Sequence, residues 1–187
     1  MTPSAGFVAS LAGFERMTTN RLAGLLAKRT PENAFAIAAG SLRPPEPFVT
    51  LFAKEPDLAT AWRRSAARRE PAAVWQQCVA AGVEVITVGD PTYPAQLLDD
   101  PRRPPALFVR GDMSALDARR VGIVGTRNAT QRGRETAARF GYELADEAVV
   151  VVSGLAKGID GAAHRGALAA AGAPPVAVVG TGPDRPY

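Results

Sequence analysis

The sequence predicts an α/β protein, with a Rossmann-like, doubly wound parallel sheet preceded by a small all-helical N-terminal domain. Three short β-branched runs, VGIVG from Val121, VVVVS from Val149 and VAVVG from Val176, each end in glycine or serine and are separated by amphipathic stretches. Strands that alternate with helices in this way are typical of a parallel sheet with helical crossovers. Residues 4–40 instead place apolar side chains at spacings of three and four, which indicates helices.

The N-terminal segment also carries helix-start signals. Thr18 and Thr19 before Asn20 offer one helix start, and Thr30 stands before Pro31, a residue that suits the first position of a helix. We therefore expect two or three short helices that form a small bundle. Residues 41–47 contain three prolines and are predicted to be a linker.

Two further helices are predicted, over residues 57–69 and 71–81, before the pattern changes to that of strands. The runs VEVITVGD from Val83 and ALFVRGD from Ala106 are strand-like, and the proline-rich loop at residues 99–105 suits neither a helix nor a central strand. The change places a domain boundary near residue 82. The predicted domains are therefore a helical domain with its linker, residues 1–81, and the N-terminal part of a Rossmann-like domain, residues 82–187.

Composition narrows the class of protein. With 187 residues, 47% of them apolar, the chain can bury the core of one domain and of a smaller second one. The net charge is only +4, so the surface as a whole is not strongly basic. A polyanionic partner would therefore have to bind at a few specific cationic side chains. A single cysteine excludes an intramolecular disulfide. We see neither a signal-peptide pattern nor an apolar run of the roughly 20 residues that span a bilayer, so we expect a cytoplasmic protein without membrane contact.

A cluster of arginines lies in the predicted helix at residues 57–69: Arg63, Arg64, Arg68 and Arg69. The cluster is either a patch that steers nucleic acid or the solvated face of a helix whose Trp62 and Ala66 point inward. The second interpretation is favoured, because charged runs on helices usually face solvent.

Residues at the end of the first predicted parallel strand suit an anion. Gly125 lets the backbone approach a ligand closely, and the helix that follows directs its free N–H groups and positive dipole end to the same place. Thr126 adds a hydroxyl, and Arg127 adds a planar cationic fork that matches phosphate. The order of residues is not the G-x-G-x-x-G dinucleotide fingerprint.

The second strand repeats this arrangement with Ser153, Gly154, Lys157 and Gly158. In a doubly wound sheet the ligand site lies outside the carboxyl ends of the strands. Two strand ends that each supply glycine, a hydroxyl and a cation therefore predict one shared anionic ligand.

Asp160 and His164 stand four residues apart and so share one face of the next helix. They form either a catalytic pair or a structural one, in which Asp160 caps the helix and His164 holds a nearby loop by a hydrogen bond. The structural interpretation is favoured, because no nucleophile stands beside the pair and no second histidine completes a metal site. We expect no catalytic residue, no metal and no cofactor.

The third strand also ends in glycine, with Gly180 and Gly182 before Asp184, which is placed to accept hydrogen bonds from a neighbouring loop or a sugar hydroxyl. An open α/β sheet normally has five or six strands. We therefore expect the Rossmann-like domain to be incomplete at its C-terminus.

Taken together, these motifs resemble the DNA-processing protein A family, also called Smf. The family's strand-G-S/T-R element matches Gly125 to Arg127, and its S-G-x-A-x-G-I-D-x-x-A-H element matches Ser153 to His164. Its G-x-G-x-D-x-x-Y element matches Gly180 to Tyr187. The resemblance covers residues 82–187.

The resemblance implies a non-enzymatic protein that binds single-stranded DNA in a basic pocket and hands it to the RecA recombinase, protecting incoming strands during natural transformation. It implies a homodimer in the full-length family. The residues it places against DNA are Gly125, Thr126, Arg127, Ser153, Gly154, Lys157 and Gly158, while Asp160, His164, Gly180, Gly182 and Asp184 are structural. Because the family's later arginine-rich element lies beyond Tyr187, we expect a fragment or natural truncation with weak activity.

Two other functions stay open from the sequence. A nucleotide phosphoribohydrolase of the lysine-decarboxylase-like group shares a related Rossmann-like plan, although its P-G-G-x-G-T-x-x-E element does not occur here. A plain interaction module, whose glycines only permit tight turns, is the third possibility.

Overall fold

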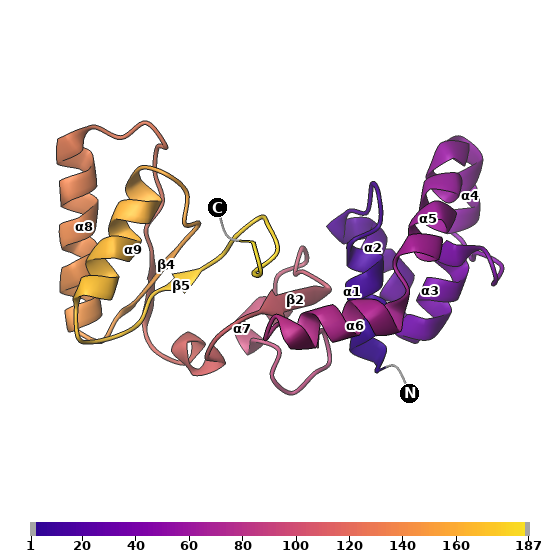
Figure 1. The fold of residues 1–187 in the computed structure, drawn as a ribbon, viewed down its shortest axis with the longest axis horizontal. Coiled ribbons are helices and arrows are strands. Elements are labelled where there is room, and N and C mark those ends of the chain that lie inside the picture. Colours follow the sequence, from indigo (N-terminus) through magenta and orange to yellow (C-terminus); the bar gives the residue numbers. More distant parts are fainter. Residues whose placement is uncertain (1–2, 186–187) are drawn as a thin grey trace. The chain divides into compact units, whose positions relative to one another are not determined.

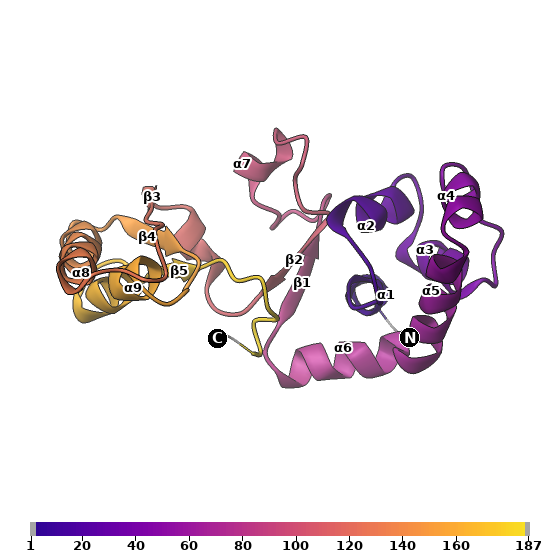
Figure 2. The ribbon, with the colours of Figure 1, turned by 90° about the horizontal axis from the view of Figure 1, so that it is seen from above.

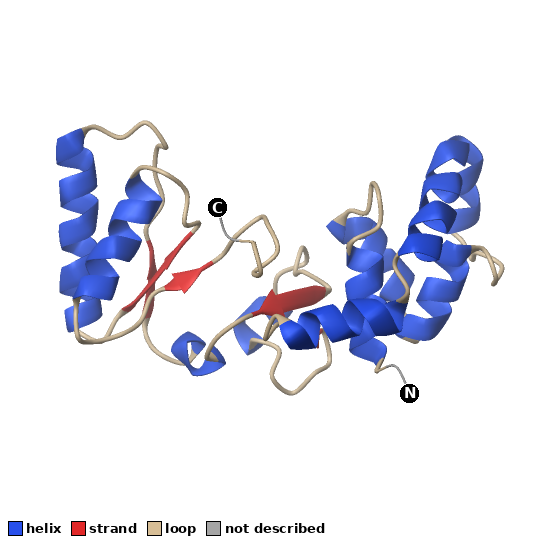
Figure 3. Cartoon of the chain, in the orientation of Figure 1, coloured by secondary structure: helices blue, strands red, loops and turns tan. Residues whose placement is uncertain are grey.

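A computed structural model describes residues 3–185 (Figure 1). The chain divides into two compact units, Met1–Val109 and Arg110–Tyr187. Helices fill most of the first unit, and strands alternate with helices in the second (Figure 3). The predicted α/β class with a helical N-terminal part is therefore confirmed. None of the described helices is long and apolar enough to cross a membrane.

Helices of the first unit begin and end close to the predicted positions. Thr18 and Thr30 accept hydrogen bonds from the backbone N–H groups of Arg21 and Asn33, so both predicted helix starts are confirmed. Helix α4 was not predicted, because it follows the proline-rich linker directly and is too short to show a clear periodicity. The helices are α1 Ser4–Ala12, α2 Thr19–Leu26, α3 Pro31–Ala39, α4 Phe48–Lys54, α5 Pro56–Arg68 and α6 Pro71–Ala80.

The core of this bundle centres on Trp62, whose side chain is fully buried, as the sequence predicts. Phe48 and Phe52 from α4 pack against its ring at centroid distances of 6.0 and 5.5 Å. Leu25 from α2 and Leu58 from α5 belong to the same cluster. Burial of such aromatic and aliphatic side chains is the main force that holds short helices together.

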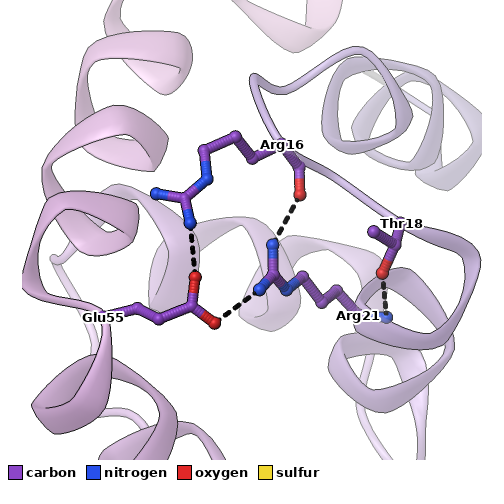
Figure 4. A network of polar contacts seen from close by, with 4 residues as sticks. All are labelled: Arg16, Thr18, Arg21 and Glu55. Atoms are coloured by element: carbon purple, nitrogen blue, oxygen red, sulfur yellow. Dashed lines mark hydrogen bonds and ion pairs between the residues drawn. The ribbon is translucent and has the colours of Figure 1, made fainter.

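A polar network fastens the chain between α1 and α2 to the start of α5 (Figure 4). The carboxylate of Glu55 accepts from Arg16 and Arg21 at 2.5 and 2.7 Å, and Arg21 also donates to the carbonyl oxygen of Arg16. Two arginines of the helical unit are thus neutralised inside the fold and are not offered to a ligand.

A hairpin follows α6, formed by β1 Glu84–Thr87 and β2 Ala106–Val109, which pair antiparallel. The loop between them contains α7 Ala95–Leu98, and the hydroxyl of Tyr93 closes it by donating to the carbonyl oxygen of Pro104 at 2.7 Å. Burial of this hydroxyl raises the pKa of Tyr93. Because α1 and α6 pack on β1, the hairpin groups with the helices in the first compact unit, which ends at Val109.

The second unit is a three-stranded parallel sheet in the order β3-β4-β5, as predicted. Val121 pairs with Val151, and Val152 pairs with Val176. Helices α8 and α9 connect the strands and lie together on one face of the sheet (Figure 2). The elements are the 3₁₀ helix η1 Met113–Leu116, β3 Arg120–Gly122, α8 Gln131–Asp146, β4 Val150–Ser153, α9 Ile159–Ala169 and β5 Val176–Ala177.

The opposite face of this sheet is open within the described residues. Val124 and Val178, which follow β3 and β5, are 79% and 65% exposed. A doubly wound sheet carries helices on both faces. Among the described residues, helices therefore cover one face of the sheet, whereas the predicted doubly wound fold has helices on both faces.

Glycines let α8 and α9 approach each other closely. A Cβ atom at Gly141 would overlap the carbonyl oxygen of Ala163, and one at Gly166 would overlap that of Ala138. The close approach seals a small core of Ala145, Val151, Ala163 and Ala167 over the sheet. This packing fixes where both helices begin, and hence the geometry at the strand ends.

We predict that Gly166→Ala lowers the free energy of unfolding by about 1–3 kcal/mol, because the methyl group has no room at the helix crossing. Helix propensity alone predicts a gain of about 1 kcal/mol, so the sign of the change tests the packing. The control is Gly133→Ala in α8, where a Cβ atom would meet the Thr130 hydroxyl at 3.2 Å and an Ile159 methyl group at 3.6 Å. Urea denaturation measures the free energy of unfolding of both variants. Equal values would contradict the close packing of α8 and α9 at Gly166.

Candidate functional site

Seven residues predicted to contact a ligand lie at one edge of the parallel sheet. Gly125, Thr126 and Arg127 follow β3, while Ser153 ends β4 and Gly154, Lys157 and Gly158 follow it. Since β3 and β4 are parallel neighbours, both loops leave the same edge. We call residues 125–127 the first loop and residues 154–158 the second loop.

A buried carboxylate bridges these two loops. Asp160, which is 7% exposed, accepts from the backbone N–H of Gly125 at 3.1 Å and from that of Gly154 at 3.2 Å. One strand position earlier, the hydroxyl of Ser153 donates to the carbonyl oxygen of Ile123 at 2.6 Å. These three hydrogen bonds join the end of β3 to the end of β4, so polar contacts fix the spacing of the two loops.

The predicted helix cap at Asp160 is wrong. The residue at the N-cap of α9 is Gly158, which has no side chain to cap with, and Asp160 lies within the first turn. Its carboxylate instead accepts from the backbone N–H groups of Gly125 and Gly154 in the two loops. The residue is structural, as expected, but through contacts between strands rather than within its own helix.

His164 is buried, with 4% of its surface exposed. Its Nε2 atom has no hydrogen-bond partner among the described residues, so this atom does not make the predicted bond to a loop. Within the same residues no hydrogen bond joins His164 to Asp160, whose carboxylate is already engaged by backbone amides. The contacts of Asp160 thus give no support to the catalytic-pair interpretation.

The first and second loops are in direct contact. Gly158 has a φ of 93°, and a Cβ atom there would overlap the carbonyl oxygen of Thr126. The N–H of Ile159 donates to that same oxygen at 3.2 Å. The backbone of Arg127 therefore lies against the turn that carries Lys157.

Arg127 and Lys157 are both exposed. Neither of them forms an ion pair with a carboxylate in the part of the chain that the structure describes. The two predicted cations are thus available to an external anion on neighbouring loops.

Two helices begin beside these cations. α8 starts at Gln131, where Thr130 caps it by accepting from the N–H of Gly133 at 3.1 Å, and α9 starts at Ile159. The N-terminus of a helix carries a partial positive charge and attracts anions. The hydroxyl of Thr126 accepts from the N–H of Asn128 at 3.2 Å, so it also shapes the approach to α8.

Sequence reasoning missed the role of Ile159. A Cβ atom at Gly125 would lie 2.7 Å from the Cγ1 atom of Ile159, so this glycine makes room for a side chain of the second loop's helix. No local pattern signals such a contact, because the two residues lie on different crossovers.

The third strand end is joined to the second by the N–H of Val178, which donates to the carbonyl oxygen of Ser153 at 2.9 Å. Asp184 pairs with Arg185 at 3.8 Å, and Arg185 also donates its N–H to the carbonyl oxygen of Gly182. Tyr187 lies outside the described residues. No group of three or more His, Cys, Asp or Glu side chains among the described residues is arranged to hold a metal ion.

The model of the family described as DNA recombination-mediator protein A matches residues 84–187, more than half of the chain. The chain belongs to this family. The match includes both loops and the Asp160 bridge, so the family motifs coincide with the residues that build the strand-end geometry.

Members of the family share clear sequence identity with this chain. The DNA processing protein DprA of Bacillus subtilis is 39% identical over 92 residues, which are 49% of this chain and 31% of that protein. Protein Smf of Escherichia coli is 42% identical over 90 residues, 48% of this chain and 24% of that protein. The matched region thus spans a third or less of each of these relatives.

The fold agrees with a solved member of the family. The X-ray structure of DNA processing protein A from Streptococcus pneumoniae superposes with a TM-score of 0.66 and 25% identity. The superposition covers 100% of this chain and 61% of that one. The likeness thus extends over the helical unit as well as the parallel sheet.

We predict that Asp160→Asn loosens the two loops and costs about 1–3 kcal/mol of stability. Asparagine offers one acceptor oxygen for two amides and turns an NH₂ group toward the other, so one backbone N–H group loses its acceptor. Hydrogen exchange at the Gly125 and Gly154 amides measures the effect. The exposed Asp184→Asn is the control, and unchanged protection at both amides in Asp160→Asn would contradict the bridge.

A second prediction concerns Gly158→Ala, which is expected to separate the first and second loops. The left-handed φ costs an L residue about 1–2 kcal/mol, and the methyl group also overlaps the carbonyl oxygen of Thr126. Thermal unfolding measures the loss against Gly180→Ala, where a Cβ atom has nothing within 4 Å. Equal melting temperatures for the two variants would show that the loops are not packed as described.

Proposed function

We propose that this chain binds single-stranded DNA through its sugar-phosphate backbone, at the first and second loops, and catalyses no reaction. The observation that carries the proposal is the contact between the two loops, because it brings Arg127 and Lys157 onto adjoining segments beside two helix N-termini. Cations beside helix N-termini match phosphate, and contacts of this kind carry little information about base sequence.

Family membership supports the choice of DNA as the anion. The relatives from Bacillus subtilis and Streptococcus pneumoniae are called DNA processing proteins. By the same resemblance we propose that the protein hands bound strands to the RecA recombinase during natural transformation, in the cytoplasm. We also propose that full-length members act as homodimers.

The phosphoribohydrolase alternative is not favoured. Such an enzyme needs a carboxylate that is free to act on a ribosyl phosphate, whereas the carboxylate of Asp160 is occupied by two backbone amides. An assay for turnover of nucleoside monophosphates separates an enzyme from a binding protein, because only the enzyme releases ribose phosphate.

We predict that Arg127→Ala and Lys157→Ala each weaken DNA binding about equally for thymidine-rich and mixed sequences. Each lost phosphate contact lowers the slope of log affinity against log salt by about 0.7 on a single strand. Fluorescence anisotropy at several salt concentrations measures both quantities.

The control for charge is Arg139→Ala, since Arg139 lies on α8 and pairs with Glu143 at 3.7 Å. Unchanged affinity in both loop variants, with wild-type protein that binds, would remove the two loops from the interface.

A further inference from the structure

A small pocket in the helical unit carries a second set of cations. It lies where α3 ends, between the turn that follows and one side of α4 and α5, and its volume is about 160 Å³. This is well below the roughly 300–1,000 Å³ of pockets that hold a whole small molecule. The pocket therefore suits one group of a larger ligand.

The pocket is cationic and contains no counter-charge. Arg43 and Arg63 line it, and no Asp or Glu side chain does. Within the described residues, neither arginine forms an ion pair. Arg64, the next residue on α5, is different because it pairs with Glu15 at 2.6 Å.

Gly40 leaves room for the side chain of Arg63 beside this pocket. The residue caps the C-terminus of α3 with a φ of 83°, and a Cβ atom there would lie 2.9 Å from the Nε atom of Arg63. The arginine side chain thus packs against the backbone at the end of α3. The residue itself stays exposed, so its charge is not removed from solvent.

An apolar wall completes the pocket. Leu42, which is 43% exposed, and the half-buried Phe52 and Pro44 line it beside the arginines. Guanidinium groups bind phosphate oxygens in a fork, and apolar or aromatic side chains support the sugar and base of a single strand. A strand of nucleotides offers both features in one repeating unit.

We propose that this pocket is a second contact for single-stranded nucleic acid, at which Arg43 and Arg63 hold one phosphate and the Leu42 wall supports its nucleotide. The inference rests on the proposed function and adds a site on the other compact unit of the chain. It assigns different functions to two neighbouring arginines of α5. Arg63 binds the ligand, while Arg64 forms an ion pair with Glu15.

The test compares Arg43→Gln and Arg63→Gln with Arg68→Gln in the full chain, using long and short thymidine oligonucleotides. Arg68 is the matched control because it is exposed on α5, lacks an ion pair and does not line the pocket. We expect Arg43→Gln and Arg63→Gln each to weaken binding of the long strand on the order of tenfold and to lower the salt slope by about 0.7. Arg68→Gln is expected to change neither, and circular dichroism checks that all variants fold.

Cross-linking gives an independent measurement that needs no variant. With a thiothymidine oligonucleotide, we expect cross-links to peptides that contain Leu42 or Phe52 as well as to the strand-end loops. Cross-links at the strand-end loops without any at the pocket would overturn the proposal.

Two failures are distinguishable. If wild-type protein binds and Arg127→Ala weakens it, but Arg63→Gln and Arg68→Gln behave alike and no pocket cross-link forms, only the second contact is wrong. If wild-type protein binds no oligonucleotide, the proposed function itself fails, and the second contact fails with it.

Discussion

A single buried carboxylate, that of Asp160, holds the ends of β3 and β4 at fixed positions. It accepts one hydrogen bond from each strand-end loop, which satisfies two backbone donors and gives the charge the partners that a buried ion needs. The loops that carry Arg127 and Lys157 are therefore set by the fold before any ligand arrives. Preorganised groups of this kind bind without the cost of ordering a flexible segment.

Glycine provides the space in which this arrangement exists. Gly125 admits the side chain of Ile159, Gly158 admits the carbonyl oxygen of Thr126, and Gly166 lets α9 approach α8. Each glycine removes a methyl group at a place where two segments distant in sequence meet. The glycine-rich motif thus serves packing between the loops at least as directly as it serves the approach of a ligand.

Much of this architecture could be predicted from local patterns, because β-branched runs and helical spacing report which faces are buried. The strands at Val121, Val150 and Val176 and the caps at Thr18 and Thr30 are of this kind. Contacts across the fold could not be predicted: Asp160 reaches an amide 35 residues earlier, and β1 packs on α1. Such contacts depend on how elements meet in space. The change of periodicity near residue 82 therefore does not show that the hairpin packs with the helices and that the first compact unit ends at Val109.

Whether an arginine or lysine forms an ion pair with a carboxylate distinguishes structural cations from candidate ligand-binding cations better than the overall composition does. In the helical unit Arg16, Arg21 and Arg64 each meet a glutamate, so their charges are balanced within the fold. At the strand ends neither Arg127 nor Lys157 forms an ion pair among the described residues, although the carboxylate of Asp160 lies in the first turn of α9. Like charges placed together destabilise a fold unless an anion neutralises them. An anionic ligand of the kind proposed above would offset the positive charge that Asp160 leaves unbalanced.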